Sequence, residues 1–143
     1  MQAHTYEFRV EWGDTDAAGI VYNPNFYKWM DQAVHYYFES IGFPLLNLVR
    51  DEKIGIPVIE SKCNFQKPLY FADHVVLHTN IIGLHNKVIK FGHIFMKEGN
   101  KIAEGYQVRA LASFDGEKLQ AITIPDRMRQ AIMESGVIEP SQV

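Results

Sequence analysis

Residues 11–27 read EWGDTDAAGIVYNPNFY, and the rest of the chain is arranged around this stretch. Two carboxylates, Asp14 and Asp16, stand two residues apart in a run of small residues. Asn23 and Pro24 follow, and these residue types favour the N-cap and the first position of a helix. The stretch therefore predicts an acidic turn that leads directly into a helix. Such a turn can be structural, can hold a metal ion or can carry catalysis.

A strand is predicted before the acidic turn and a long helix after it. Apolar and charged side chains alternate over residues 6–12, which is the period of a half-buried strand. Over residues 24–41 the polar side chains fall on one narrow stripe, which is typical of a helix buried on most sides. Gly42 and Pro44 are expected to end this helix. Residues 45–53 read as a second, shorter helix.

The remainder of the chain reads as strands joined by tight turns. Four strands, a brief pairing segment and a C-terminal helix are predicted over residues 57–65, 75–82, 88–97, 102–114, 119–123 and 126–135. No strand–helix–strand alternation is present, which argues against a parallel doubly wound sheet. The predicted fold is α+β, with one antiparallel sheet of about five strands wrapped around the long helix. One such sheet leaves apolar surface and edges uncovered, so we expect a second subunit.

Length and composition limit the possible functions. A chain of 143 residues is expected to form a single domain, residues 1–143. The net charge of −3 argues against a nucleic-acid partner. No apolar run approaches the roughly 20 residues that span a bilayer, and no apolar signal core opens the chain. We therefore expect a cytoplasmic protein with no membrane partner. The single cysteine, Cys63, allows no internal disulfide and predicts a buried, inert thiol.

Three features favour a functional role for the acidic turn. Its small residues leave room for a ligand, and the helix that follows offers free N–H groups and a dipole that can polarise a carbonyl. Nearby aromatic side chains can form an apolar pocket: Trp12, Tyr22, Phe26 and Tyr27. An Asp-x-Asp pair can also hold Mg²⁺, but the phosphotransferases that use it at a strand end need a parallel sheet and a longer chain. The six histidines include no metal-binding spacing, and no Gly-x-Ser-x-Gly motif supports a serine nucleophile.

Residues 9–29, RVEWGDTDAAGIVYNPNFYKW, resemble the signature of the 4-hydroxybenzoyl-CoA thioesterase family of hot-dog folds, which includes general acyl-CoA thioesterases. The likeness rests on the Asp-x-Asp pair, the glycine three residues later, the Val-Tyr pair and the aromatic-rich helix. It continues more weakly through Pro57, Phe65, residues 68–73 and residues 124–125. The resemblance implies an antiparallel sheet around a central helix, assembled as a homodimer or homotetramer.

The resemblance also implies hydrolysis of an acyl-CoA thioester to a free acid and CoA, with neither metal nor organic cofactor. It makes Asp16 the catalytic carboxylate, either as a nucleophile or as the base for a water molecule. The backbone N–H that polarises the thioester carbonyl falls at Asn23. Tyr22 lines the acyl pocket, Gly19 belongs to the substrate site, and Lys87 lies near the CoA phosphates.

Other assignments stay open at this stage. Asp14 reads as a brace, and Glu60 and Lys90 are weaker site candidates. His35 stands four residues after Asp31, which predicts a simple contact along the helix. The acyl group is open, and so is the choice between a CoA and a carrier-protein thioester. A non-catalytic acyl-CoA-binding module and a hot-dog dehydratase or hydratase are the alternatives, although the H-x-x-x-x-G-x-x-x-x-P pattern typical of the latter is absent.

Overall fold

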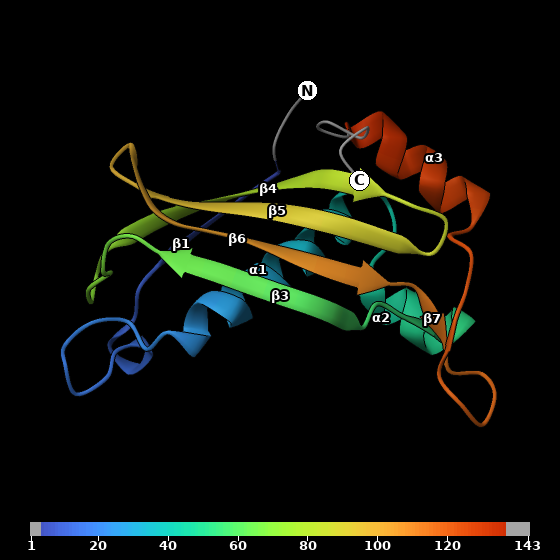
Figure 1. Ribbon diagram of the computed structural model, residues 1–143, viewed down its shortest axis with the longest axis horizontal. Coiled ribbons are helices and arrows are strands. Elements are labelled where there is room, and N and C mark those ends of the chain that lie inside the picture. Colours follow the sequence, from blue (N-terminus) through green and yellow to red (C-terminus); the bar gives the residue numbers. More distant parts are fainter. Residues whose placement is uncertain (1–3, 137–143) are drawn as a thin grey trace.

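A computed structural model describes residues 4–136, so both ends of the predicted single domain, residues 1–3 and 137–143, lie outside the described part. An antiparallel sheet with strand order β1-β4-β5-β6-β3 lies against helix α1 (Figure 1). Its strands are β1 (His4–Arg9), β3 (Val58–Phe65), β4 (His74–Leu84), β5 (Val88–Lys97) and β6 (Asn100–Ala110). The predicted α+β arrangement of five antiparallel strands around a long helix is confirmed.

Helix α1, Pro24–Ser40, has the predicted start and ends one residue earlier than expected. Its buried side chains are Phe26, Trp29, Met30, Ala33, Val34, Tyr37 and Phe38. They join two core clusters, one in which Phe26 packs on Phe95 and another in which Tyr37 packs on Phe91. Each large apolar side chain buried in this way contributes roughly 1.5–3 kcal/mol. The wide apolar face read from the sequence is thus the surface that anchors α1 to the sheet.

Shorter elements complete the fold at the end of the sheet beyond β6. Helix α2 (Leu45–Asn47) continues into a π-helical turn (Leu48–Glu52), where one α-helix was predicted. Strands β2 (Ile54–Gly55), β7 (Ala112–Ser113) and β8 (Gln120–Ala121) form a small second sheet, of which β2 was not predicted. Helix α3 (Asp126–Ser135) has the predicted bounds. None of the helices within residues 4–136 is long and apolar enough to cross a membrane.

Two predicted strands are wrong in extent. The first predicted strand ends at Arg9, not at residue 12, because Trp12 begins a 3₁₀ turn, Trp12–Asp14. This turn is held by the bond from the Glu11 N–H to the Asp14 side chain and by the bond from the Thr15 N–H to the Trp12 carbonyl. The long strand predicted for residues 102–114 is interrupted at Leu111. The Leu111 side chain is fully buried and its N–H donates to the carbonyl of Lys87 at 3.0 Å, which turns the chain from the large sheet into the small one.

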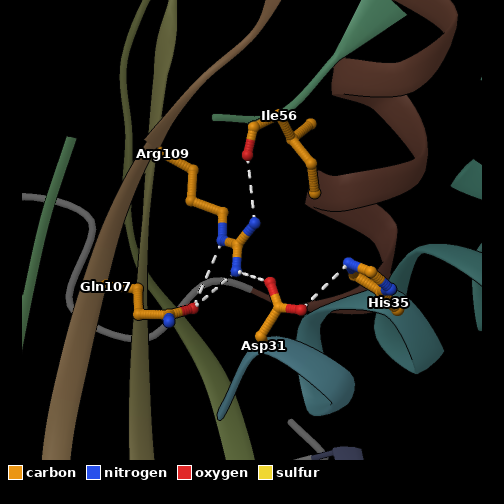
Figure 2. Close-up of polar contacts among 5 residues, drawn as sticks. All are labelled: Asp31, His35, Ile56, Gln107 and Arg109. Atoms are coloured by element: carbon orange, nitrogen blue, oxygen red, sulfur yellow. Dashed lines mark hydrogen bonds and ion pairs between the residues drawn. The ribbon is translucent and has the colours of Figure 1, made fainter. Parts of the chain in front are cut away.

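A buried arginine joins α1 to the sheet (Figure 2). Arg109 on β6 donates to Asp31 Oδ1 at 2.5 Å, to the carbonyl of Ile56 at 3.0 Å and to Gln107 Oε1 at 3.0 and 3.2 Å. Only 4% of the Arg109 side chain is exposed, against 44% of Asp31. His35 Nε2 lies 3.5 Å from Asp31 Oδ2, which confirms the predicted contact along the helix. Asp31 is therefore shared between its helical neighbour and a residue 78 positions away.

The lone cysteine behaves as its apolar surroundings predict. Cys63 on β3 is buried, and this burial raises the pKa of its thiol to about 11. At neutral pH almost none of it is thiolate, the form that acts as a nucleophile. The predicted inert thiol is confirmed, and Cys63 packs in the same cluster as Phe26 and Phe95.

Candidate active site

The acidic turn is a compact loop closed by its own backbone. Thr15 and Val21 form an isolated antiparallel bridge, and the Asp16 N–H donates to the Ile20 carbonyl at 2.9 Å. Gly19 has a φ of +83°, a left-handed conformation that glycine adopts without strain, and open space surrounds the position of a Cβ there. The sequence Asp-x-Asp followed by a glycine three residues later thus encodes a tight turn with free space at its tip.

The two carboxylates of the turn have different surroundings. Asp14 Oδ2 accepts from the Glu11 N–H at 2.8 Å, and the Asp14 carbonyl accepts from the Tyr22 N–H and from Asn25 Nδ2 at 2.9 and 2.8 Å. Asp14 therefore ties the turn to the start of α1, in keeping with its predicted role as a brace. Sequence reasoning missed Asn25, whose position near a helix start gave no signal of this long-range bond.

Asp16 is exposed, and only one of its carboxylate oxygens is used within the turn. Oδ1 accepts from the Ala18 N–H at 2.9 Å, and the Asp16 carbonyl accepts from the Gly19 N–H at 2.9 Å. None of the hydrogen bonds within residues 4–136 uses Oδ2. The local bonds fix the orientation of the side chain, and they leave one oxygen for a substrate or a water molecule.

The start of α1 offers fewer free N–H groups than the sequence suggested. Pro24 has none, the Asn25 N–H donates to the Tyr22 carbonyl at 2.9 Å, and the Phe26 N–H donates to the Asn23 carbonyl at 3.1 Å. The expected side-chain cap is also wrong, because Asn23 adopts helical dihedral angles and its side chain makes no capping bond. Within the described chain no acceptor contacts the Asn23 N–H. Of these backbone N–H groups at the helix start, the Asn23 N–H is thus the one left without an acceptor within residues 4–136.

A groove of about 310 Å³ runs beside this N–H. Its lining includes Ile20, Asn23, Phe26, Phe65, Gln66 and Lys67. Phe26 and Phe65 pack edge to face with their ring centroids 5.0 Å apart, which gives the groove an apolar side. Asp16 lies in the turn just before Ile20 and is not part of the lining. The groove is at the lower end of the size range of small-molecule sites.

The predicted aromatic pocket does not form as a single cluster. Phe26 packs into the core, whereas Tyr22 is 56% exposed and Trp12 is 74% exposed. Trp12 packs against Phe71 with ring centroids 5.6 Å apart. Sequence proximity was misleading here, because Phe26 is buried in the core whereas Tyr22 and Trp12 are exposed.

Lys87 lies far from the groove within one chain. Phe65 pairs with Ala103 on β6, which pairs with Phe95 on β5, so this cross-strand row marks the groove end of the sheet. Lys87 precedes β5, eight residues before Phe95, which corresponds to about 26 Å along the strand. Figure 1 shows the β4–β5 turn and the acidic turn at opposite ends of the molecule. Lys87 and Asn23 therefore do not share a site within one chain.

The weaker candidates lie on the outer face of the sheet. The Tyr106 hydroxyl donates to Glu60, and Lys90 Nζ stands 4.4 Å from the centre of the Tyr106 ring. Glu60 is thus a paired strand residue, the simpler of the two alternatives read from the sequence. Asp14, Asp16 and the histidines form no metal centre in residues 4–136, where no three potential metal ligands gather.

The chain was compared with known proteins. The thioesterase-like superfamily matches residues 10–132. The structure of a gentisyl-coenzyme A thioesterase aligns with a TM-score of 0.83 at 46% identity, covering 90% of this chain and 98% of the other. The 4-hydroxybenzoyl-CoA thioesterase of Pseudomonas sp. (strain CBS-3) is 29% identical over 128 residues, which are 85% of this chain and 91% of the relative.

The chain is also similar to a solved structure that contains a bound acyl-CoA. An Asp-to-Asn variant of 4-hydroxybenzoyl CoA thioesterase, complexed with 4-hydroxybenzoyl CoA, aligns with a TM-score of 0.86 at 27% identity. The match covers 92% of this chain and 99% of that one. The family match over residues 10–132 includes the acidic turn, and the structural matches cover at least 90% of the chain. The chain therefore belongs to the thioesterase-like superfamily, with the hot-dog fold, and is a thioester hydrolase.

Proposed function

We propose that this protein hydrolyses the CoA thioester of a hydroxylated aromatic acid, with Asp16 as the reactive carboxylate. The observation that carries the proposal is that the segment leading into α1 holds a carboxylate oxygen and a backbone N–H that no described residue uses. Within residues 4–136 neither Asp16 Oδ2 nor the Asn23 N–H has a hydrogen-bond partner, and the two residues lie three positions before and four positions after Gly19 at the tip of the turn. A carboxylate and a hydrogen-bond donor at the positive end of a helix suit attack on a carbonyl.

The Asn23 N–H would donate to the thioester oxygen and stabilise the negative charge that develops on it. Asp16 then acts by one of two routes. As a nucleophile it attacks the carbonyl carbon and expels CoA thiolate, which leaves a mixed anhydride that water cleaves. As a general base it takes a proton from the attacking water, and the tetrahedral intermediate collapses with loss of CoA thiolate. Both routes end in a free carboxylate and CoA, and both use the same two groups.

The substrate class is supported by two relatives and by the lining of the groove. The relatives are named for gentisyl-coenzyme A and 4-hydroxybenzoyl-CoA, both of which carry a hydroxylated benzoyl group. Phe26 and Phe65 give the groove an aromatic side against which a flat acyl group can pack. Tyr22 and Gly19 are proposed to border the acyl group at the turn. A panel of hydroxybenzoyl, benzoyl, short-chain and long-chain acyl-CoAs, with a carrier-protein thioester included, tests this class directly.

A homodimer or homotetramer is part of the proposal, because one edge of the sheet is open and apolar. Strand β3 is an edge strand, and Val58 and Ile59 on it are 45% and 60% exposed. Antiparallel pairing of β3 with its counterpart in a second copy would cover this edge. The pairing would also place the β4–β5 turn of the second copy, with its Lys87, at the groove end of the first. Light scattering that gives a monomer at assay concentration would contradict this assembly.

The decisive experiment compares Asp16→Asn with Asp14→Asn. We expect Asp16→Asn to lower kcat by about 10²–10⁴, the usual contribution of a positioned acid or base, while acyl-CoA binding measured by calorimetry persists. Asn at position 14 can still accept from the Glu11 N–H, so turnover should change by less than tenfold in that control. Full turnover in Asp16→Asn would refute the assignment of Asp16, because hydrolysis would then proceed without its carboxylate.

A further inference from the structure

Two hollows meet at Lys67, just beyond the end of β3. The groove beside Asn23 and a second hollow, also of about 310 Å³, share Lys67 and Pro68 in their linings. The second hollow is completed by Tyr70, Lys97, Glu98, Asn100 and Ile102. The two linings, which join at Lys67 and Pro68, outline a path from Asn23 at the start of α1 to the β5–β6 turn.

The backbone holds Lys67 firmly on one wall of this path. The N–H groups of Gln66 and Lys67 both donate to the Ile102 carbonyl, at 2.9 and 3.1 Å. Two residues later, the Leu69 carbonyl accepts from the Val21 N–H at 2.9 Å, which ties this segment to the one that enters α1. These bonds therefore hold the backbone of Lys67 in place beside the groove, although its side chain extends into solvent.

The charge of Lys67 is available to a ligand. Lys67 is exposed and makes no ion pair with any residue of the described chain, 4–136. The other lysine of the two hollows, Lys97, is bound to Asp73 at 2.9 Å and lies over the ring of Tyr70. Of these two cations, Lys67 is the one that no carboxylate of the described chain neutralises. It is also the one that lines both hollows.

We propose that Lys67 binds the diphosphate of CoA. The proposal rests on the proposed function, and it adds the residue that recognises the nucleotide part of the substrate. With the thioester at Asn23, the pantetheine arm would run along the apolar side formed by Phe26 and Phe65. Its diphosphate would then meet the Lys67 ammonium, a compact point charge that binds phosphate well. The second hollow, with Tyr70, would take the groups beyond the diphosphate.

The test uses two thioesters of the same acid, one with CoA and one with N-acetylcysteamine, which has the thioester and no phosphate. We expect Lys67→Glu to raise KM for the acyl-CoA at least tenfold with kcat changed less than twofold. The same variant should hydrolyse the N-acetylcysteamine thioester at the wild-type rate. Lys67→Arg, which keeps the charge, should restore a KM within about threefold of wild type. Lys28→Glu is the matched control, because Lys28 is an exposed lysine on α1 outside both hollows.

Each other outcome has a distinct meaning. An unchanged KM for acyl-CoA in Lys67→Glu, or an equal loss with both thioesters, would overturn the proposal. The acyl-dephospho-CoA, which lacks the 3′-phosphate, should show the same Lys67→Glu effect. If the effect disappears with that substrate, Lys67 contacts the 3′-phosphate and the diphosphate assignment is wrong. Failure of the wild-type protein to hydrolyse either thioester would instead refute the proposed function.

Discussion

Replacement of Asp31 by alanine should loosen α1 from the sheet. The substitution removes the carboxylate that faces the buried guanidinium of Arg109 at 2.5 Å. Arg109 would keep its bonds to Gln107 and to the carbonyl of Ile56, but its positive charge would lose its carboxylate partner in a site where only 4% of the side chain is exposed. A buried charge left without its partner destabilises a fold far more than the loss of an exposed ion pair.

The expected loss follows from the exposure of the two partners. Breaking a fully buried ion pair costs about 3–5 kcal/mol, and a hydrogen bond to a charged group contributes about 1.5–3 kcal/mol. Asp31 is 44% exposed, so water already screens part of the attraction, and Arg109 retains two acceptors. We therefore expect Asp31→Ala to lower the free energy of unfolding by about 2–3 kcal/mol. The double variant with Arg109→Met should lose less than the sum of the single losses, because the two residues act together.

Urea unfolding, followed by tryptophan fluorescence at one fixed protein concentration, measures this loss and keeps any contribution of assembly constant. The control is Asp51→Ala, which breaks the exposed Arg50–Asp51 pair at 2.8 Å. The distances in the two pairs are similar, and burial is the main difference between them. The control should change stability far less than Asp31→Ala does, because water screens this exposed pair. An Asp31→Ala loss no larger than that of the control would refute the argument from burial.

Two further predictions concern packing and pH. A Cβ at Gly105 would lie 2.4 Å from the backbone carbonyl oxygen of Lys62, so Gly105→Ala should cost at least about 2 kcal/mol in the urea assay. Gly92→Ala, which meets only the Ile82 side chain at 3.1 Å, should cost less than about 1 kcal/mol; equal costs would contradict the packing argument. Burial lowers the pKa of His93 from 6.5 to about 3, so the unfolded chain takes up a proton at this residue between these values while the folded protein does not. Stability should therefore fall by about 2 kcal/mol from pH 7 to pH 5, and His93→Gln should remove that part of the fall.

The sequence alone predicted most of the secondary structure correctly, since hydrophobic periodicity and turn residues are local signals. The bounds of β5 and α3 and the start of α1 agree with it. The failures have two causes, burial against distant parts of the chain and local turn bonds that the alternation pattern does not reveal. Burial of Leu111 cut one predicted strand, and the capped 3₁₀ turn at Trp12 shortened another.

For the site, the sequence placed Asp16 and Asn23 at a turn before a helix, and it indicated which chemistry such a pair can perform. Only the tertiary structure showed which hydrogen-bonding groups of this turn and helix start have no partner within residues 4–136. The bonds from the Asn25 and Phe26 N–H groups to nearby carbonyls, and the missing N–H of Pro24, left the Asn23 amide as the donor that no acceptor within residues 4–136 uses. Hydrogen bonds and ion pairs between residues far apart in the chain leave no periodic trace in a sequence. For the same reason the Arg109–Asp31 pair, the position of Lys67 beside the groove and the distance of Lys87 from it became visible only once the sheet had formed around the helix.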